Sequence, residues 1–173
     1  MKYIELTKGK SAIVDDEDYE TLNSYKWQYT NDGYTTRRLN GQKGKTISMH
    51  RQIMNPPVEK YVDHINHNKL DNRRTNLRLC TRAENYQNQF KQKNNTSGYK
   101  GVNWYSKYGK WQATIMSGKH FKHLGYYYKI EDAARAYNGA AKLYHGAFAA
   151  LNDVPDKPLP WVVQEKRDEA IAS

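Results

Sequence analysis

The chain has 173 residues, 38% of them hydrophobic, so it can build one ordinary domain or two small ones with modest cores. Its formal net charge of +10 favours a polyanionic partner, because clustered Lys and Arg release counterions from phosphates, and nucleic acid is favoured over a membrane surface. The single cysteine, Cys80, excludes an internal disulfide framework and a multi-cysteine zinc site, and no disulfide-linked partner is expected.

The positive charge is unevenly distributed along the chain. Residues 61–93 carry seven Lys and Arg against three Asp and Glu, and residues 94–152 carry eight against two, whereas residues 1–60 carry ten against eight. A nucleic-acid face is therefore expected in residues 61–152. No apolar run reaches the roughly 18 residues of a bilayer span, and MKYIELTKGK lacks a signal-peptide core, so we expect a cytoplasmic protein with no membrane partner.

Residues 1–54 have the alternation and the aromatic and β-branched content of short strands. We expect strands at YIEL, SAIV, YKWQYT, GYTTRRL and KTISMHRQIM, separated by turns at NDG and NGQKG. The acidic run Asp15–Asp18 fits either a solvated turn or the start of a helix, and the Asn-Pro-Pro at 55–57 ends whatever precedes it.

The run DHINHNKLDNRRTNLR, residues 63–78, is polar enough to be a solvated loop on composition alone. The residues that follow it indicate more order. Thr81 and Glu84 have the spacing of a capping box, which predicts a helix that begins at Thr81 and contains Asn85 about one turn inside. Residues 87–98 are polar and predict the end of that helix and a linker.

The residue types around position 63 suit phosphodiester hydrolysis. That reaction needs a base that deprotonates water and positive charge near the departing oxygen, which a hard divalent cation held by oxygen ligands supplies. Asp63 is a suitable ligand, His64 a suitable base, and Asn85 offers a neutral carbonyl oxygen. Because neighbouring residues of a strand point to opposite faces, Asp63 and His64 can share a site only if the strand ends or bends there.

A second module is predicted after residue 98. YKGVNWY, KWQATIM and KHFKHLGYY predict a three-stranded antiparallel meander. A helix over residues 130–145 follows, closed by Gly146. One face of this helix is expected to carry Ile130, Ala133, Tyr137, Ala140 and Tyr144. One helix covers one face of such a sheet and leaves the other face free.

The segment VDHINHNKLDNRRTNLRLCTRAEN, with the MHR before it, resembles the HNH motif of phage and intron-encoded homing endonucleases, in the variant whose last His is replaced by Asn. The resemblance implies a ββα-metal fold with one divalent cation, Mg²⁺ or Mn²⁺. It assigns Asp63 and Asn85 to the metal and His64 to the general base. Asn76 is expected to orient the residue that carries the imidazole and to fix its tautomer.

Other polar residues of this segment have two readings each. Arg73, Arg74 and Arg78 become phosphate clamps under the resemblance, although a solvated role is equally open. His67 stands where the family usually has Gly at a turn that favours positive φ, and it is either a ligand or phosphate contact or a tolerated turn residue. His50 of MHR either supports the site or faces substrate, or is a strand residue that packs on the site.

Residues 96–152 resemble the AP2 DNA-binding domain of plant transcription factors, which also occurs joined to HNH nucleases, through SGYKGVNWYSKYGKWQATI, HLGYY, EDAARAYNGAA and FAALN. The resemblance implies that the sheet enters the major groove of double-stranded DNA. The plant arginines are absent, so the plant target sequence is not carried over. The DNA-contacting residues so implied are Asn103, Tyr105, Thr114, Lys122 and His123 on the strands, Lys107, Lys110 and Lys119 at the turns, and Trp111, for which a core role is the alternative.

The sequence thus predicts an α+β protein. Its N-terminal ββα-metal (HNH) nuclease module with extra β-strands spans residues 1–90. A linker at 91–97 joins it to an AP2-like three-stranded sheet plus one helix at 98–153, and residues 154–173 form a tail without an assigned function. The expected function is a metal-dependent, site-preferring DNA endonuclease of the homing type in a bacterial or phage-infected cell. It would nick as a monomer or cut both strands as a homodimer; the alternative is a catalytically inactive DNA-binding regulator on the same modules.

Overall fold

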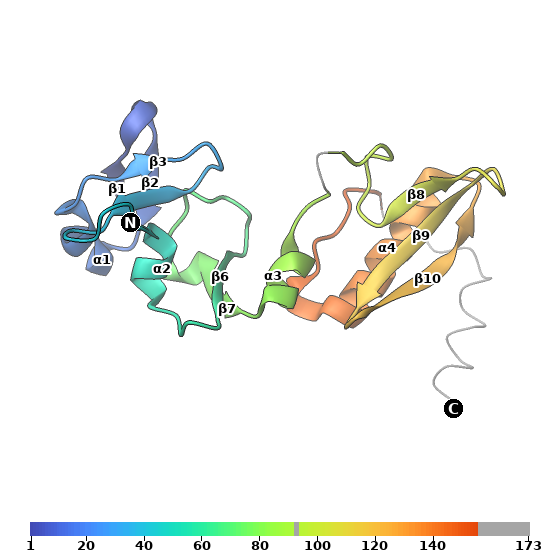
Figure 1. Ribbon diagram of the computed structural model, residues 1–173. Coiled ribbons are helices and arrows are strands. Elements are labelled where there is room, and N and C mark those ends of the chain that lie inside the picture. The colour runs from blue at the N-terminus through green and yellow to red at the C-terminus, as the bar shows by residue number, and fades with distance from the viewer. Residues whose placement is uncertain (92–93, 156–173) are drawn as a thin grey trace. The chain divides into compact units, whose positions relative to one another are not determined.

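The computed structural model describes residues 1–91 and 94–155. The chain forms two compact units with the boundary between Asn88 and Gln89, and Figure 1 labels the elements of each. In the part of the chain that is described, no helix has the length and apolar character of a transmembrane span.

The first unit begins with a hairpin and a short helix. β1 (Lys2–Glu5) and β2 (Ser11–Val14) pair antiparallel around a 3-10 turn at Thr7–Gly9. The acidic run then opens helix α1 (Asp16–Asn23). Carboxylates in the first turn of a helix are stabilised by the exposed backbone N–H groups, which favours the helix over the turn that was the alternative.

Next comes a small sheet, followed by a helix. The sequence predicts strands in this region but does not predict the helix. The sheet has the order β3-β4-β5, with β3 at Gln28–Tyr29, β4 at Thr35–Arg38 and β5 at Thr46–Ser48. The expected strand over KTISMHRQIM is wrong beyond Ser48, because residues Met49–Met54 form helix α2. Met49, His50 and Ile53 are buried at helical spacing, and Asn55 ends α2 with a left-handed φ of 41° ahead of the two prolines. His50 therefore lies on a helix, not on a strand.

The last elements of the first unit are two strands and a helix. β6 (Tyr61–His64) and β7 (Leu77–Cys80) pair antiparallel with His64 opposite Leu77, and the 3-10 turn Arg74–Asn76 leads into β7. Helix α3 spans Arg82–Asn88. The predicted capping box is confirmed: the N–H of Thr81 donates to the Glu84 carboxylate at 2.7 Å, and the N–H of Glu84 donates to the Thr81 hydroxyl at 3.2 Å.

The hydrophobic core of the first unit joins these elements. Its buried members are Ile4, Leu6, Ala12, Val14, Leu22, Trp27, Met49, Ile53, Val62 and Leu77. Because β6 and β7 each contribute one of these residues, the core holds both strands against the hairpin and α2.

The second unit contains the predicted meander and helix. The antiparallel sheet has the order β10-β9-β8, with β8 at Val102–Tyr105, β9 at Lys110–Ser117 and β10 at His120–Tyr127. Helix α4 (Ile130–His145) packs on one face of it, as Figure 1 shows, and ends at Gly146 with φ of 53°. A Cβ on Gly101 would lie 2.1 Å from the ring of Tyr137, so the close approach of helix and sheet requires glycine there.

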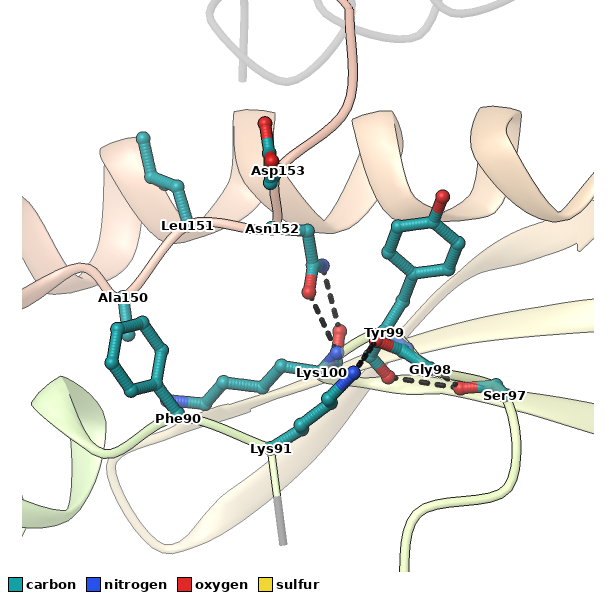
Figure 2. Close-up of a pocket in the computed structure, with 10 residues that line it drawn as sticks. All are labelled: Phe90, Lys91, Ser97, Gly98, Tyr99, Lys100, Ala150, Leu151, Asn152 and Asp153. Carbon is teal, nitrogen blue, oxygen red and sulfur yellow. Dashed lines mark hydrogen bonds between the residues drawn. The ribbon is translucent and has the colours of Figure 1, made fainter.

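A cavity of about 550 Å³ opens beside the lead-in to β8 (Figure 2). The N–H of Lys100 donates to Asn152 Oδ1 at 2.7 Å, and Asn152 Nδ2 donates back to the Lys100 carbonyl at 3.0 Å. Asn138 and Asn152 are joined in the same reciprocal way at 2.7 and 2.8 Å. These hydrogen bonds of side-chain amides hold the segment after α4 against the sheet. The polar groups on this side of the cavity are therefore engaged in holding the fold together.

Candidate active site

Asp63 and His64 are buried side by side at the end of β6. Their exposed fractions are only 8% and 4%. The strand ends at His64, and the chain then turns: the N–H of His67 donates to the His64 carbonyl at 3.0 Å, and His67 adopts a φ of 62°. The strand end that the sequence requires is therefore present. His67 also has the positive φ expected at this turn position.

The Asp63 carboxylate has two partners in the first unit. Arg78, directly opposite on β7, approaches it with Nε at 2.9 Å and Nη2 at 2.8 Å. Asn88, at the end of α3, donates Nδ2 to the two carboxylate oxygens at 3.0 and 2.9 Å, and to the His64 carbonyl at 3.3 Å. The buried charge is thus compensated by a guanidinium and an amide.

The amide that contacts Asp63 differs from the predicted one. Asn85 is half-buried in the middle of α3, and its N–H makes the helical hydrogen bond to Thr81. Asn88 follows three residues later, and residues at that spacing share a helix face. Sequence reasoning missed Asn88, although the i, i+3 repeat of Asn in this helix is a signal that identifies it.

The residue types near Asp63, a carboxylate and the carboxamides of α3, can bind a hard divalent cation, but the atoms that contact the carboxylate are those of the Arg78 guanidinium and Asn88 Nδ2. A carboxylate and carboxamide oxygens are the ligand types that Mg²⁺ and Mn²⁺ prefer. Over residues 1–91 and 94–155 there is no group of three or more His, Cys, Asp and Glu that could hold an ion. A site here would therefore take Asp63 and an α3 amide from the chain, with its remaining positions left to water and substrate, as is usual for Mg²⁺.

Two aromatic rings, those of His50 and Tyr34, lie next to the His64 imidazole. The His64 and His50 ring centroids are 5.0 Å apart in an edge-on contact, and Tyr34 lies 5.4 Å from His50 and 6.1 Å from His64. Burial lowers the pKa of His64, and burial together with the neighbouring His64 and Arg51 lowers the pKa of His50 to about 3. His50 is therefore neutral at physiological pH and supports His64 by packing.

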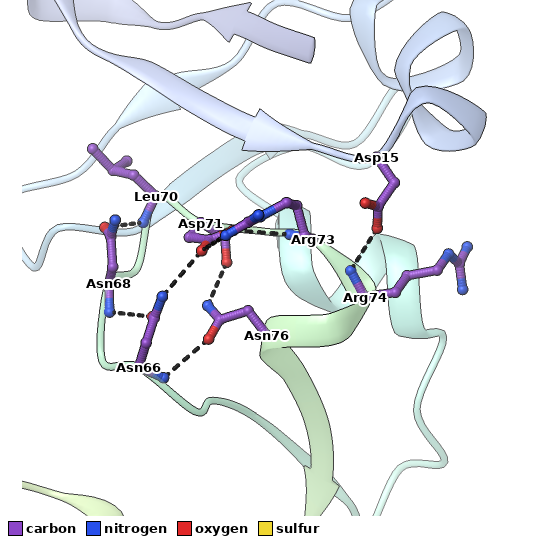
Figure 3. A network of polar contacts seen from close by, with 8 residues as sticks. All are labelled: Asp15, Asn66, Asn68, Leu70, Asp71, Arg73, Arg74 and Asn76. Carbon is purple, nitrogen blue, oxygen red and sulfur yellow. Dashed lines mark hydrogen bonds and ion pairs between the residues drawn. The ribbon is translucent and has the colours of Figure 1, made fainter. Parts of the chain in front are cut away.

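The loop between β6 and β7 is closed by side-chain amides (Figure 3). The N–H of Asn66 donates to Asn76 Oδ1 at 2.9 Å, and Asn76 Nδ2 donates to the Asp71 carbonyl at 2.7 Å. Asn76 thus contacts backbone on both sides of the loop that follows His64. The hydrogen-bond partner of the imidazole is another residue, Asn72, whose acceptor Oδ1 lies 3.3 Å from His64 Nε2.

The three predicted phosphate clamps each face a carboxylate. Arg73 contacts Asp71 through Nε at 2.7 Å and Nη2 at 2.6 Å, and this guanidinium lowers the pKa of Asp71. Arg74 contacts Glu17 and Asp18 at 2.8 Å, which assigns the acidic run of α1 a partner in the β6–β7 loop. With Arg78 on Asp63, all three arginines have intramolecular ion-pair partners.

The strand register of the second unit separates the two faces of its sheet. Val102, Ala113 and Ile115 are buried toward α4, so alternation directs the residues between them to the open face. Outward positions are Asn103, Tyr105, Gln112, Thr114, His123 and Tyr126, with Asn103 opposite Gln112 and Thr114 opposite His123. The ring of Tyr126 contacts those of His123, Tyr108 and Tyr105 at 4.5, 4.9 and 5.3 Å. Gln112 and Tyr126 were not among the predicted residues.

Two predicted DNA contacts lie on the helix side of this sheet. Lys122 is paired with buried Ile115, and its ammonium lies 4.5 Å from the ring centroid of Tyr144 on α4. Trp111 packs against the core and edge-on to Trp104 at 5.1 Å. Lys122 therefore does not lie on the open face of the sheet, where a DNA contact was expected. Trp111 lies against the core, which was the alternative to a DNA contact. Lys107 and Lys119 are exposed beside the turns, as expected.

A carboxylate and an imidazole lie at the end of one strand of a two-stranded hairpin, and the Asn88 amide of the following helix contacts the carboxylate, an arrangement consistent with a nuclease of the ββα type. The comparisons with known proteins agree. A family model described as HNH endonuclease matches residues 52–87. The chain is 33% identical over 153 residues to "Uncharacterized HNH endonuclease L560" of Acanthamoeba polyphaga mimivirus, covering 85% of this chain and 77% of that protein.

It is also 38% identical over 68 residues to "Protein 3.8" of Escherichia phage T7, covering 38% of this chain and 56% of that protein. No solved structure matches the chain. On the length and identity of the mimivirus match, the chain belongs to the HNH endonuclease family. It is a nuclease, and its nuclease domain implies DNA as a substrate.

Proposed function

We propose that this protein is a metal-dependent, site-preferring endonuclease of the homing type that hydrolyses phosphodiester bonds of double-stranded DNA. The observation that carries the proposal is the burial of Asp63 beside His64 where β6 ends, with the Asn88 amide of α3 on the carboxylate. A buried imidazole whose pKa is lowered, next to a buried carboxylate, makes this end of β6 a candidate functional site.

The roles follow from the chemistry of each group. His64, whose pKa is lowered by burial, is neutral near pH 7 and accepts the proton of the attacking water. Asp63 and Asn85 would hold one Mg²⁺ or Mn²⁺, which when bound supplies the positive charge that stabilises the phosphate and its departing oxygen. Asn76 maintains the loop after His64 through its contacts with Asn66 and Asp71.

The second unit is proposed to be an AP2-like anchor that selects the site. Residues 99–129 contain six Lys and no Asp or Glu, which favours a polyanion. The open face of its sheet presents amides, hydroxyls and an imidazole, the groups that read base edges in the major groove. The residues proposed to contact bases are Asn103, Tyr105, Gln112, Thr114 and His123. Those proposed to contact phosphates are Lys107, Lys110 and Lys119.

One observation favours the second candidate, an inactive DNA-binding regulator. Both oxygens of Asp63 already have protein partners in Asn88, and Arg78 neutralises the carboxylate. A protein in which this ion pair persisted on DNA would bind without cutting.

In the endonuclease reading, a monomer has one active site and nicks one strand, whereas a homodimer has two and cuts both.

A plasmid assay separates the two candidates. Supercoiled plasmids that carry genomic fragments are incubated with the protein and Mg²⁺ or Mn²⁺, and in parallel with chelator. The endonuclease nicks or linearises a subset of plasmids only with metal, and His64→Ala abolishes cleavage while the gel shift stays intact. His120→Ala, an exposed histidine on β10, is the matched control and cleaves normally. Binding without cleavage under every metal condition supports the regulator.

A further inference from the structure

The His64 imidazole has a buried hydrogen-bond partner to which neither the HNH motif nor the comparisons assign a role. We infer that Asn72 is a positioning residue that holds His64 in the tautomer with the proton on Nε2, so that Nδ1 carries the free lone pair. This inference rests on the proposed role of His64 as the general base. It specifies which of the two ring nitrogens accepts the proton.

The backbone of Asn72 is fixed by the hairpin at the start of the chain. Its N–H donates to the Ile13 carbonyl at 2.8 Å, and the N–H of Ile13 donates to the Leu70 carbonyl at 2.8 Å. Asp71 forms an isolated parallel bridge with Ile13 of β2. Asn72 therefore behaves like a residue of an extra strand, and its side chain is held in place by tertiary contacts outside the loop.

The orientation of the Asn72 amide follows from its second contact. One side of the amide lies 3.4 Å from the Lys69 carbonyl, which can only accept, so that side must be Nδ2. Oδ1 then faces the imidazole at 3.3 Å from Nε2. Asn72 is 0% exposed, so the arrangement is closed to bulk water, which would otherwise supply either partner.

A carboxamide oxygen can only accept, so the ring nitrogen opposite it must donate. In a neutral imidazole the other nitrogen is then an acceptor, and that nitrogen is Nδ1. Asn76 does not compete for the ring, since both ends of its amide are bonded to the backbone of Asn66 and Asp71. His50 meets the His64 ring edge-on at 5.0 Å and restricts its rotation from another side.

The tautomer can be measured without catalysis. The full chain, labelled with ¹⁵N-histidine and free of metal, is examined by NMR near pH 8, where the two ring nitrogens of His64 are distinguished by their ¹⁵N shifts and their couplings to the ring protons. We expect a protonated Nε2 with a slowly exchanging N–H. A proton on Nδ1 in the wild-type protein would overturn the inference, whatever the outcome of the cleavage assay.

Two variants separate positioning from mere stability. Asn72→Asp keeps an acceptor for Nε2 and should keep the protected N–H, whereas Asn72→Ala should lose it. In single-turnover cleavage at saturating metal, Asn72→Ala should be slower by roughly 10–100-fold with an unchanged gel shift, as for other orienting partners of site residues. Asn72→Asp should recover most of that rate, and equal loss in both variants contradicts the inference.

Asn68→Ala is the control for damage to the loop. Asn68 lies on the same loop and bonds the N–H of Leu70 at 3.1 Å, and it is exposed. We expect it to leave the His64 resonances and the rate unchanged. If Asn72→Ala proves unfolded by thermal melting, the wild-type tautomer and Asn72→Asp still decide. If the wild-type protein never cleaves, the proposed function fails while the NMR result stands.

Discussion

Asn88 donates its side-chain N–H groups to both oxygens of Asp63, at 3.0 and 2.9 Å, from the last residue of α3. Asn85, the residue assigned to the cation by the HNH resemblance, lies three positions earlier in the same helix. We propose separate roles for these two carboxamides of α3: Asn88 positions the carboxylate, and Asn85 supplies an oxygen ligand to the cation.

This division predicts different effects for the two amides. Asn85→Ala should weaken Mn²⁺ binding by roughly 10–100-fold, measured by calorimetry, with little change in stability. Asn88→Ala should lower the free energy of unfolding by about 1–3 kcal/mol, because it removes hydrogen bonds from a buried carboxylate. Loss of Mn²⁺ binding in Asn88→Ala but not in Asn85→Ala would instead make Asn88 the ligand.

Replacing Arg78 should make stability depend on metal. Arg78 and Asp63 are both largely buried, so Arg78→Met leaves an uncompensated carboxylate and should cost about 3–5 kcal/mol of unfolding free energy. A divalent cation can replace the lost positive charge, so Mg²⁺ or Mn²⁺ should raise the melting temperature of Arg78→Met more than that of the wild type. An equal rise in both proteins would place the cation away from Asp63.

The contribution of Asp71 to the free energy of unfolding should be lost at acid pH. The contact with Arg73 lowers the folded-state pKa of Asp71 from its ordinary value of 3.8. A lowered carboxyl pKa adds stability that is fully present above the unfolded pKa and is lost as pH falls through the folded value. Urea unfolding should therefore show wild type more stable than Asp71→Asn near pH 6, with the difference shrinking below about pH 4. A difference that stays constant from pH 6 to pH 3 would rule out this linkage.

His67→Gly should stabilise the first unit. The φ of 62° at His67 lies in the left-handed region, which costs an ordinary residue about 1–2 kcal/mol, while glycine enters it freely but loses more chain entropy. The backbone part of this change, measured by chemical denaturation, is an expected gain of roughly 0.5–1 kcal/mol, from which the loss of the His67 side-chain contacts is subtracted. His120→Gly, at the first residue of β10, should destabilise the second unit. A loss of stability in His67→Gly would mean that the contacts of the imidazole outweigh the relief of backbone strain.

The two faces of the second sheet should respond differently to substitution. Lys107→Ala and Lys119→Ala should weaken binding to all DNA sequences and reduce the salt slope by about 1 each. Gln112→Ala and His123→Ala should change which sequences are selected from a random pool. Lys122→Ala, on the helix side, is the matched lysine control and should bind as wild type. A Lys122→Ala defect equal to that of Lys119→Ala would argue against the open face.

The local structure around the candidate site was predictable from the sequence, and its side-chain contacts were less so. The strand end at His64, the capping box at Thr81 and Glu84, and α4 all depend on residues close together in the chain, and each appears as expected. The catalytic roles of Asp63 and His64 stay predictions. The prediction of a strand over residues 49–54 was wrong. In six residues, the apolar spacing of a strand and that of a helix are hard to tell apart. Burial of Met49 and Ile53 on one face decides for the helix.

What the sequence by itself determined is therefore local: strand ends, helix starts, and the residue types that can hold a cation or move a proton. Only the tertiary structure decided which residue meets which. Asn72 reaches His64 because Ile13 holds its backbone, and Arg74 meets Asp18 from 56 residues away. Local periodicity carries no information on such long-range partners, because they depend on how the hairpin, the loop and the two strands pack around one core.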